Sequence, residues 1–258
     1  MRLPRFGRAR TTANPDGAMS LVDHLAELRH RLFVALIALA VGMVFGFLLY
    51  HRVLDWLVHP YCDVKHSVDP GSSCRLVVTD PLESFSIRLK MSGYLGLLFA
   101  SPVVLWQLWR FITPGLKDTE KRYAIPFIVS SIALFLMGAA LAIATFPKTL
   151  EFFAAFGGND LELLYTPTKY LGLLVLMMLI FGLGFEFPII LVFLEIAHVL
   201  KWQQLAKYRR YAVVGIFVVD AVITPSGDPI TLLAMAVPMV LFYEISILIG
   251  RFGLRRGT

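Results

Sequence analysis

The sequence predicts an all-α integral membrane protein with six transmembrane helices. Hydrophobic residues make up 57% of the 258 residues and charged residues only 16%, whereas soluble domains carry about 25% charged residues. The mean hydropathy of +0.71 is correspondingly high. Six apolar runs, most of them close to the roughly 20 residues that a spanning helix needs, cover residues 32–50, 91–112, 124–146, 170–197, 211–224 and 230–250.

The fifth run, 211–224, is the shortest. About 14 residues at a rise of 1.5 Å each cover about 21 Å, less than a hydrocarbon core of about 30 Å. The run therefore predicts either a locally thinned bilayer or a re-entrant segment.

The placement of basic residues predicts that both termini lie in the cytoplasm. With the N-terminus inside, the inside segments hold 17 of the 24 Lys and Arg residues and the outside segments hold 7. This is the asymmetry expected of cytoplasmic loops. Topology and contact with anionic lipid thus explain the pI of about 9.4, and no nucleic-acid partner is predicted.

Three regions follow from the same patterns. Residues 1–19 form a basic tail that we expect to be disordered, cytoplasmic and attracted to lipid, without the apolar core of a cleaved signal peptide. Residues 20–250 form the six-span membrane domain. Residues 251–258 form a second basic cytoplasmic tail.

The segment before the first span carries leucines at helical spacing, at positions 21, 25, 28 and 32. This stripe predicts a helix that lies along the membrane surface before the chain turns into the first span. Glu27 and Arg31 are spaced as an i,i+4 ion pair on the other side of that helix.

The long outside segment 51–85 contains Pro60 and both cysteines, Cys62 and Cys74. A disulfide between the two cysteines is possible where the compartment is oxidising. The six histidines and two cysteines show no metal-ligand spacing, so we predict no metal site and no cofactor.

The stretch "IFGLGFEFPIILVF" places Glu186 inside an apolar run. An ionised side chain at the bilayer centre costs roughly 3 kcal/mol on insertion scales, so such a carboxylate usually faces a partner or a pathway. Pro188, two residues later, removes a helical hydrogen bond and predicts a kink in the fourth span.

Familiar catalytic motifs are missing from the sequence, including the P-loop, the zinc-protease His-Glu-x-x-His and the hydrolase Gly-x-Ser-x-Gly. We therefore predict that the protein is not an enzyme. The rival interpretation is a proton-coupled small-solute transporter that uses Glu186 as its protonation site. An intramembrane hydrolase would need a nucleophile, a base and an orienting group in one plausible set, which the sequence does not offer.

Four stretches together resemble the TatC family, the core subunits of the twin-arginine protein translocase. They are "HLAELRHRL", "SPVVLWQLWRFITPGLKDTEKR", "FGLGFEFP" and "YAVVGIFVVDAVITPSGD", and they occur in the family's order across residues 20–250. The resemblance implies a curved, concave bundle of six spans, with the fifth and sixth short. It also implies binding of the twin-arginine signal peptides of folded precursors and export driven by the proton-motive force. The implied partners are TatA-type and TatB-type single-span subunits and further TatC copies.

The resemblance also implies site residues. Glu27 and Glu120 match the family's two cytoplasmic glutamates that bind the arginine pair. A guanidinium group presents a planar fork of donors that a carboxylate accepts in two bonds, which lysine does not reproduce. Arg29 and Phe111 match neighbouring positions that orient this pocket.

Further matches fall inside or outside the membrane. Glu186 matches a glutamate that would contact a partner or a passenger protein; the alternative is an internal hydrogen bond between the fourth and fifth spans. Glu244, in the sixth span, has the same two interpretations. Pro60 and Asp228 match positions that hold the outer cap in shape. Asp220 departs from the family pattern, because a small or apolar residue is expected there, and it could share a proton or a water molecule with Glu186.

Overall fold

The computed structural model of the chain describes residues 21–68, 76, 78, 80–112, 124–157 and 166–252. These residues form helices and connecting turns, and no strand occurs among them. The helices are α1 (Leu21–Val68), α2 (Glu83–Ile112), α3 (Ala124–Gly157), α4 (Pro167–Gly184), α5 (Phe187–Ile196), α6 (Trp202–Ile223) and α7 (Pro229–Phe252). Because α4 and α5 are two halves of one span, the predicted all-α fold with six spans is confirmed.

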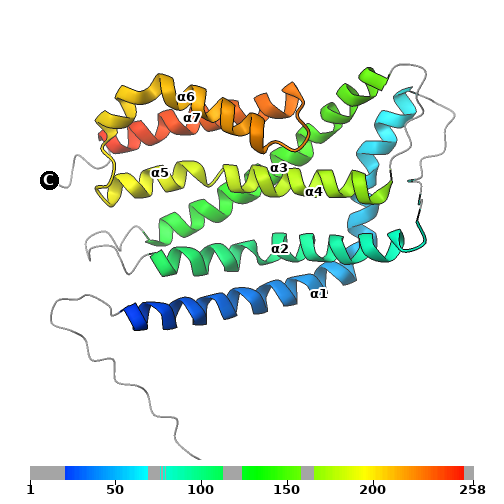
Figure 1. Ribbon diagram of the computed structural model, residues 1–258, viewed down its shortest axis with the longest axis horizontal. Coiled ribbons are helices and arrows are strands. Elements are labelled where there is room, and N and C mark those ends of the chain that lie inside the picture. Colours follow the sequence, from blue (N-terminus) through cyan, green and yellow to red (C-terminus); the bar gives the residue numbers. More distant parts are fainter. Residues whose placement is uncertain are drawn as a thin grey trace, which may run out of the picture.

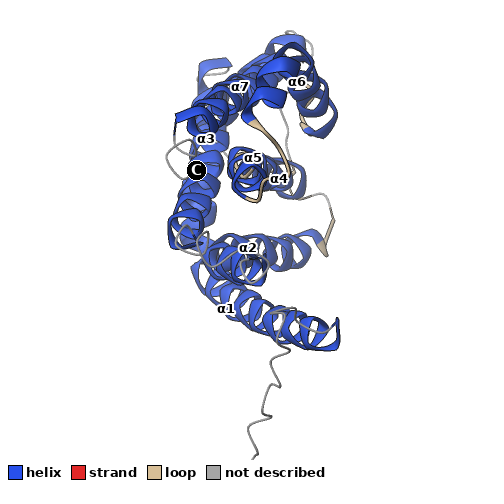
Figure 2. Cartoon of the chain, turned by 90° about the vertical axis from the view of Figure 1, so that its left-hand side faces the viewer, coloured by secondary structure: helices blue, strands red, loops and turns tan. Residues whose placement is uncertain are grey.

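The spans form a curved bundle. α2, α4 with α5, α6, α7 and the first part of α1 run roughly side by side, and α3 crosses them at an angle (Figure 1). In the view turned by 90°, α1 and α2 lie at one end of an arc and α6 and α7 at the other, with α3 along the back (Figure 2). The span made of α4 and α5 lies between the two ends. α6 and α7 have 22 and 24 residues and are the shortest spans, as expected.

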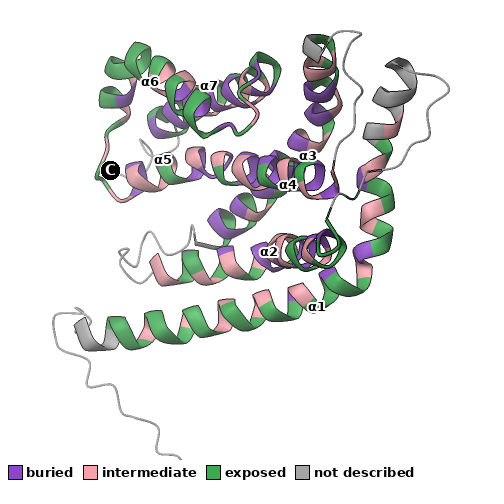
Figure 3. Cartoon of the chain, turned by 45° about the vertical axis from the view of Figure 1, so that its right-hand side comes forward, coloured by how far each residue is buried: buried purple, intermediate pink, exposed green. Residues whose placement is uncertain are grey.

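The α4–α5 span forms the centre of the core. Leu171, Met177 and Phe181 are completely buried, together with Phe146 from α3. A helix that is apolar all round is expected in such a central position. In contrast, α1 presents many exposed apolar side chains, and Figure 3 shows its length as mostly exposed. In a bilayer those side chains contact lipid.

Glycines let neighbouring spans approach closely. A Cβ atom added to Gly42 of α1 would lie 2.5 Å from the carbonyl oxygen of Gly96 of α2. A Cβ added to Gly138 of α3 would lie 2.4 Å from the carbonyl oxygen of Phe181 of α4. Both contacts bring helix backbones together, as small residues commonly do in membrane proteins, where van der Waals packing holds helices together.

The structure corrects the prediction for the first span. The leucine stripe does not form a separate surface helix, because α1 is one continuous helix from Leu21 to Val68. No proline interrupts residues 21–59, so nothing in the sequence ends the helix before the span. Helix α1 also extends through residues 51–68, which we expected to belong to an outside loop. This final part of α1 turns across the ends of α2 and α4 toward the end of α3 (Figure 1).

The fifth span is also longer than its apolar run indicates. Helix α6 begins at Trp202 and has 22 residues, which at 1.5 Å per residue extend about 33 Å. Of the two alternatives for this run, the continuous helix α6 favours a single span over a re-entrant segment. Because Lys207, Arg209 and Arg210 interrupt the hydropathy of its first half, α6 is not among the five described helices that are apolar enough to span a membrane by composition.

The predicted kink in the fourth span is confirmed as a break between α4 and α5. Proline has no amide hydrogen, so Pro188 at the start of α5 cannot bond to the preceding turn. Glu186 lies in the break, where its amide donates to the carbonyl oxygen of Leu183 at 3.1 Å. The break thus places a glutamate at the point where the helix is interrupted.

Candidate functional site

The start of α1 carries the first predicted site residue, Glu27. Its Oε1 atom accepts hydrogen bonds from both Nε and Nη2 of Arg31, one turn later. The two side chains are only 21% and 14% exposed. Glu27 Oε2 is buried and has no hydrogen-bond partner among the residues that the structure describes, so this oxygen keeps an unused capacity to accept a hydrogen bond.

The end of α2 contacts the start of α1 at the same end of the bundle. The Phe111 ring stacks on the His24 imidazole with ring centroids 4.5 Å apart. Arg29, between His24 and Arg31 on α1, is exposed. Glu120 follows α2 by eight residues in the chain and lies outside the described residues.

Glu186 belongs to a hydrogen-bonded chain across three spans. The Ser131 hydroxyl of α3 donates to Glu186 Oε2 at 2.5 Å, and Trp109 Nε1 of α2 donates to the Ser131 oxygen at 3.0 Å. Glu186 is 7% exposed. Its internal hydrogen bond therefore joins the fourth span to the third, and not to the fifth.

Asp220 and Glu244 lie on the neighbouring helices α6 and α7. Asp220 is fully buried, and neither of its carboxylate oxygens has a hydrogen-bond partner among the described atoms. From the sequence we expected that Asp220 could share a proton or a water molecule with Glu186, but no direct hydrogen bond joins these two side chains. Glu244 Oε1 lies 2.9 Å from Arg209 Nε, so an ion pair at the surface joins α7 to α6.

At the opposite end of the bundle, Asp228 caps α7. Its Oδ1 accepts from the Thr231 amide at 2.8 Å, and its Oδ2 accepts from the Thr231 hydroxyl at 2.5 Å. That hydroxyl is also 2.7 Å from the Thr149 hydroxyl of α3. The carboxylate therefore fixes both the first turn of α7 and its contact with α3.

Pro60 and Cys62, which we predicted for the outer side of the membrane, lie on the final part of α1. Pro60 lies within the helix. Cys62 is disulfide-bonded; Cys74, its predicted partner, lies outside the described residues. In the described part of the chain, no group of three or more histidine, cysteine or acidic side chains could hold a metal ion.

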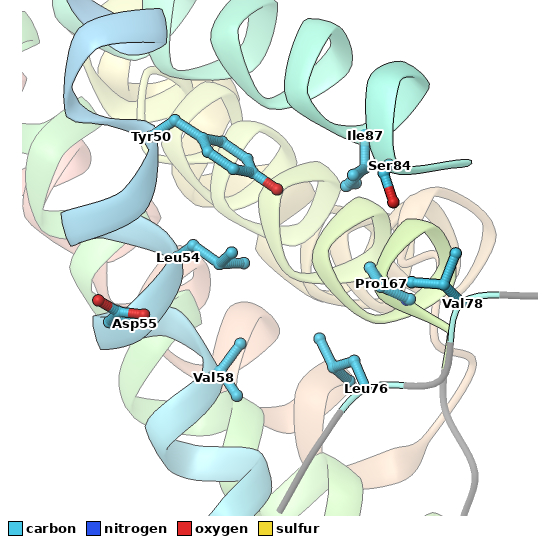
Figure 4. A pocket seen from close by; sticks show the side chains of 9 residues that line it. All are labelled: Tyr50, Leu54, Asp55, Val58, Leu76, Val78, Ser84, Ile87 and Pro167. Carbon is cyan, nitrogen blue, oxygen red and sulfur yellow. The ribbon is translucent and has the colours of Figure 1, made fainter. Parts of the chain in front are cut away.

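A cavity of about 460 Å³ lies beside this part of α1. Tyr50, Leu54 and Val58 of α1 line it together with Ile87 of α2 and Pro167 of α4 (Figure 4). The Tyr170 hydroxyl donates to the Leu57 carbonyl oxygen at 2.7 Å and ties α4 to α1 nearby. The lining is mostly apolar, so this cavity offers room for apolar groups.

The sequence interpretation overlooked Glu195, nine residues after Glu186 in the same apolar run. Glu195 is 4% exposed, and neither of its carboxylate oxygens has a hydrogen-bond partner in the described part of the chain. A second acid within one span was a signal available in the sequence. Ser131 and Trp109 gave no such signal, because an isolated serine or tryptophan in a span is ordinary.

Comparisons with known proteins agree on one family. A family model described as "Sec-independent protein translocase protein (TatC)" matches residues 23–238. The protein of that name from Frankia casuarinae is 41% identical over 253 residues, which cover 96% of this chain and 70% of the relative. The one from Aquifex aeolicus is 37% identical over 243 residues, covering 92% of this chain and 97% of the relative.

A solved structure has the same fold. It is the crystal structure of the twin arginine translocase receptor TatC in DDM, with a TM-score of 0.70 and 38% sequence identity. The match covers 88% of this chain and 99% of that one. Sequence and fold together show that the chain belongs to the TatC family and is a multi-pass membrane component of the Sec-independent protein translocase.

Proposed function

We propose that this chain is the receptor for twin-arginine signal peptides, and that Glu27 and Glu120 bind the two arginines on the cytoplasmic face. The related crystal structure is that of a twin arginine translocase receptor, which supports this role. The observation that carries the proposal is the Glu27 carboxylate, which already accepts two hydrogen bonds from a guanidinium group and has no partner for its second oxygen among the described residues.

The Arg31 guanidinium occupies one oxygen of the Glu27 carboxylate, the group that we assign to an arginine of the signal peptide. An incoming arginine either occupies Oε2 of Glu27 beside Arg31 or displaces Arg31 from Oε1. Because an incoming guanidinium would replace an equivalent one, the exchange gains little at a single carboxylate. Two carboxylates that receive two adjacent arginines are therefore needed for useful affinity.

Phe111 and Arg29 position this pocket. The stack of Phe111 on His24 holds the start of α1 against the end of α2. The segment that carries Glu120 leaves α2 at that same end, and eight residues reach at most about 28 Å. Glu120 is thus within reach of Glu27, and exposed Arg29 borders the opening of the site.

The proposed topology places both termini in the cytoplasm. The start of α1 and the end of α7 lie at the same end of the bundle (Figure 1), which supports this orientation. Residues 20–250 then form one membrane domain between two basic tails. We assign the domain a scaffold role, with single-span TatA-type and TatB-type subunits and further TatC copies as partners, the proton-motive force as the energy source, and no catalytic activity of its own.

A peptide-binding measurement tests the proposal. The full chain in detergent should bind a fluorescent twin-arginine signal peptide, and a Glu27→Gln, Glu120→Gln double variant should lose this binding. Glu151→Gln removes an exposed carboxylate at the opposite end of α3 and serves as the matched control. Undiminished binding by the double variant would remove the proposed pocket.

A further inference from the structure

A second pocket lies where α5 ends and α6 begins, at the end of the bundle that also carries Glu27. Its volume is about 150 Å³, and its lining includes Glu195, His198, Lys201, Trp202, Gln203 and Gly250. The pocket is larger than a single ion needs and too small for a folded peptide segment.

One wall of the pocket is a buried carboxylate. Glu195 is 4% exposed, and both of its oxygens lack a hydrogen-bond partner among the described residues. A Cβ atom added to Gly250 would lie 2.5 Å from Glu195 Oε1, so the carboxylate rests on the bare backbone of α7. A buried carboxylate without donors is costly, and Glu195 is among the residues that line the pocket.

Another part of the pocket lining suits an anion. Lys201 is exposed and precedes the first residue of α6, Trp202, and Gln203 follows in the first turn. The Lys201 amide already donates to Gln204 Oε1 at 3.0 Å, which leaves the amides of Trp202 and Gln203. Amide groups at a helix N-terminus attract anions, and phosphate groups in particular. Helix α5 ends at Ile196 on the Glu195 side, where its dipole favours a cation. The pocket lining thus combines a group that attracts a cation with groups that attract an anion.

We propose that this pocket binds the headgroup of phosphatidylethanolamine, with the ammonium on Glu195 and the phosphate at the start of α6 beside Lys201 and Gln203. An ammonium group donates up to three hydrogen bonds, enough for both carboxylate oxygens. A lysine or arginine side chain from another protein would satisfy Glu195 but would leave the anion-binding wall empty. Val199, next to the pocket, is 65% exposed and offers an apolar surface to an acyl chain.

Other lipid headgroups match the two walls less well. Phosphatidylglycerol supplies the phosphate but no cation for Glu195. Phosphatidylcholine carries a cation without N–H donors and with three additional methyl groups. Lipid binding here is independent of signal-peptide binding, because it involves different residues and a different ligand.

Native mass spectrometry of the full chain in detergent tests this assignment. The protein is incubated with equal amounts of the three lipids with matched acyl chains, and the retained lipids are counted. We expect about a tenfold preference for phosphatidylethanolamine over phosphatidylcholine, within the range that one charge-assisted hydrogen bond provides. Glu195→Gln and Lys201→Gln should each abolish most of the preference, whereas Glu151→Gln and Lys207→Gln should retain it.

Several outcomes would overturn the proposal. They are equal retention of the three lipids, a preference for phosphatidylglycerol, or a preference that survives both pocket variants. Soluble O-phosphoethanolamine should compete only at large excess; binding as tight as the lipid's would identify a soluble ligand instead. If Glu195→Gln does not fold, Lys201→Gln decides alone, because Lys201 is exposed. Retention of an arginine peptide through Glu195 without lipid preference would assign a protein partner.

Discussion

The Ser131 hydroxyl donates a 2.5 Å hydrogen bond to Glu186 Oε2, joining α3 to the break between α4 and α5. The same hydroxyl oxygen accepts from Trp109 Nε1 of α2 at 3.0 Å. One serine thus links three spans at the point where the central helix is interrupted. The contact satisfies one oxygen of a carboxylate that the apolar surroundings would otherwise destabilise.

Ser131→Ala should destabilise the protein by about 1–3 kcal/mol, because it removes the hydroxyl that donates to Glu186 and accepts from the Trp109 indole. Thermal unfolding in detergent measures the effect. Ser130→Ala changes the adjacent, exposed serine and should leave the melting temperature unchanged. Equal melting temperatures for the two variants would show that the hydrogen-bonded chain contributes nothing to stability.

Gly96→Ala should disrupt the contact between α1 and α2. The new Cβ would lie 2.7 Å from the Met43 amide nitrogen and 2.8 Å from its Cα, so the two backbones must separate. We expect a loss of about 1–3 kcal/mol in unfolding free energy, as for other overpacked sites. Gly172→Ala, with nothing within 4 Å of its added Cβ, is the control and should be neutral or stabilising. An equal loss of unfolding free energy in both variants would show that the close approach of α1 and α2 at Gly96 does not limit the size of this residue.

Asp228→Ala should destabilise α7 by about 1–2 kcal/mol, because the helix loses its N-cap. Asp228→Ser keeps a capping oxygen and should recover most of the loss. Hydrogen exchange of the amides in the first turn of α7 reports the effect locally. An Ala variant as well protected as the Ser variant would show that the cap is dispensable.

Arg31→Gln should strengthen binding of a twin-arginine peptide by about two- to fivefold, because Glu27 no longer has a resident guanidinium to release. The change removes one positive charge. Lys207→Gln removes a charge from α6, away from the proposed site, and controls for the general effect on a cationic ligand. Weaker binding by Arg31→Gln would mean that Arg31 helps to hold the peptide.

The apolar runs predicted the spans well because each span reflects a local composition. Their ends were predicted less well, since α1 continues through the more polar residues 51–68 and α6 through Lys207 and Arg209. Helical hydrogen bonds do not require apolar side chains, so a helix can extend well beyond the membrane. Pro188 was predictable for the opposite reason, because its missing amide acts locally.

The polar contacts inside the bundle were not predictable from spacing. Ser131 and Glu186 are 55 positions apart, and no periodicity in either span indicates that they meet. Glu195 was missed because it matches none of the family positions that we used. Only the structure shows that its carboxylate oxygens lack hydrogen-bond partners among the described residues. Glu27 and Phe111 were identified through the resemblance, and the structure adds their contacts with Arg31 and His24.

The most direct test of the receptor role is a double-mutant cycle between Glu27 and the arginine pair of a bound signal peptide. Affinities are measured for the wild-type chain and Glu27→Gln, each with peptides carrying two arginines or one arginine and one glutamine. A direct charge pair predicts a coupling of at least about 1 kcal/mol at one of the two arginines. Strictly additive losses at both arginines would show that Glu27 does not contact the signal.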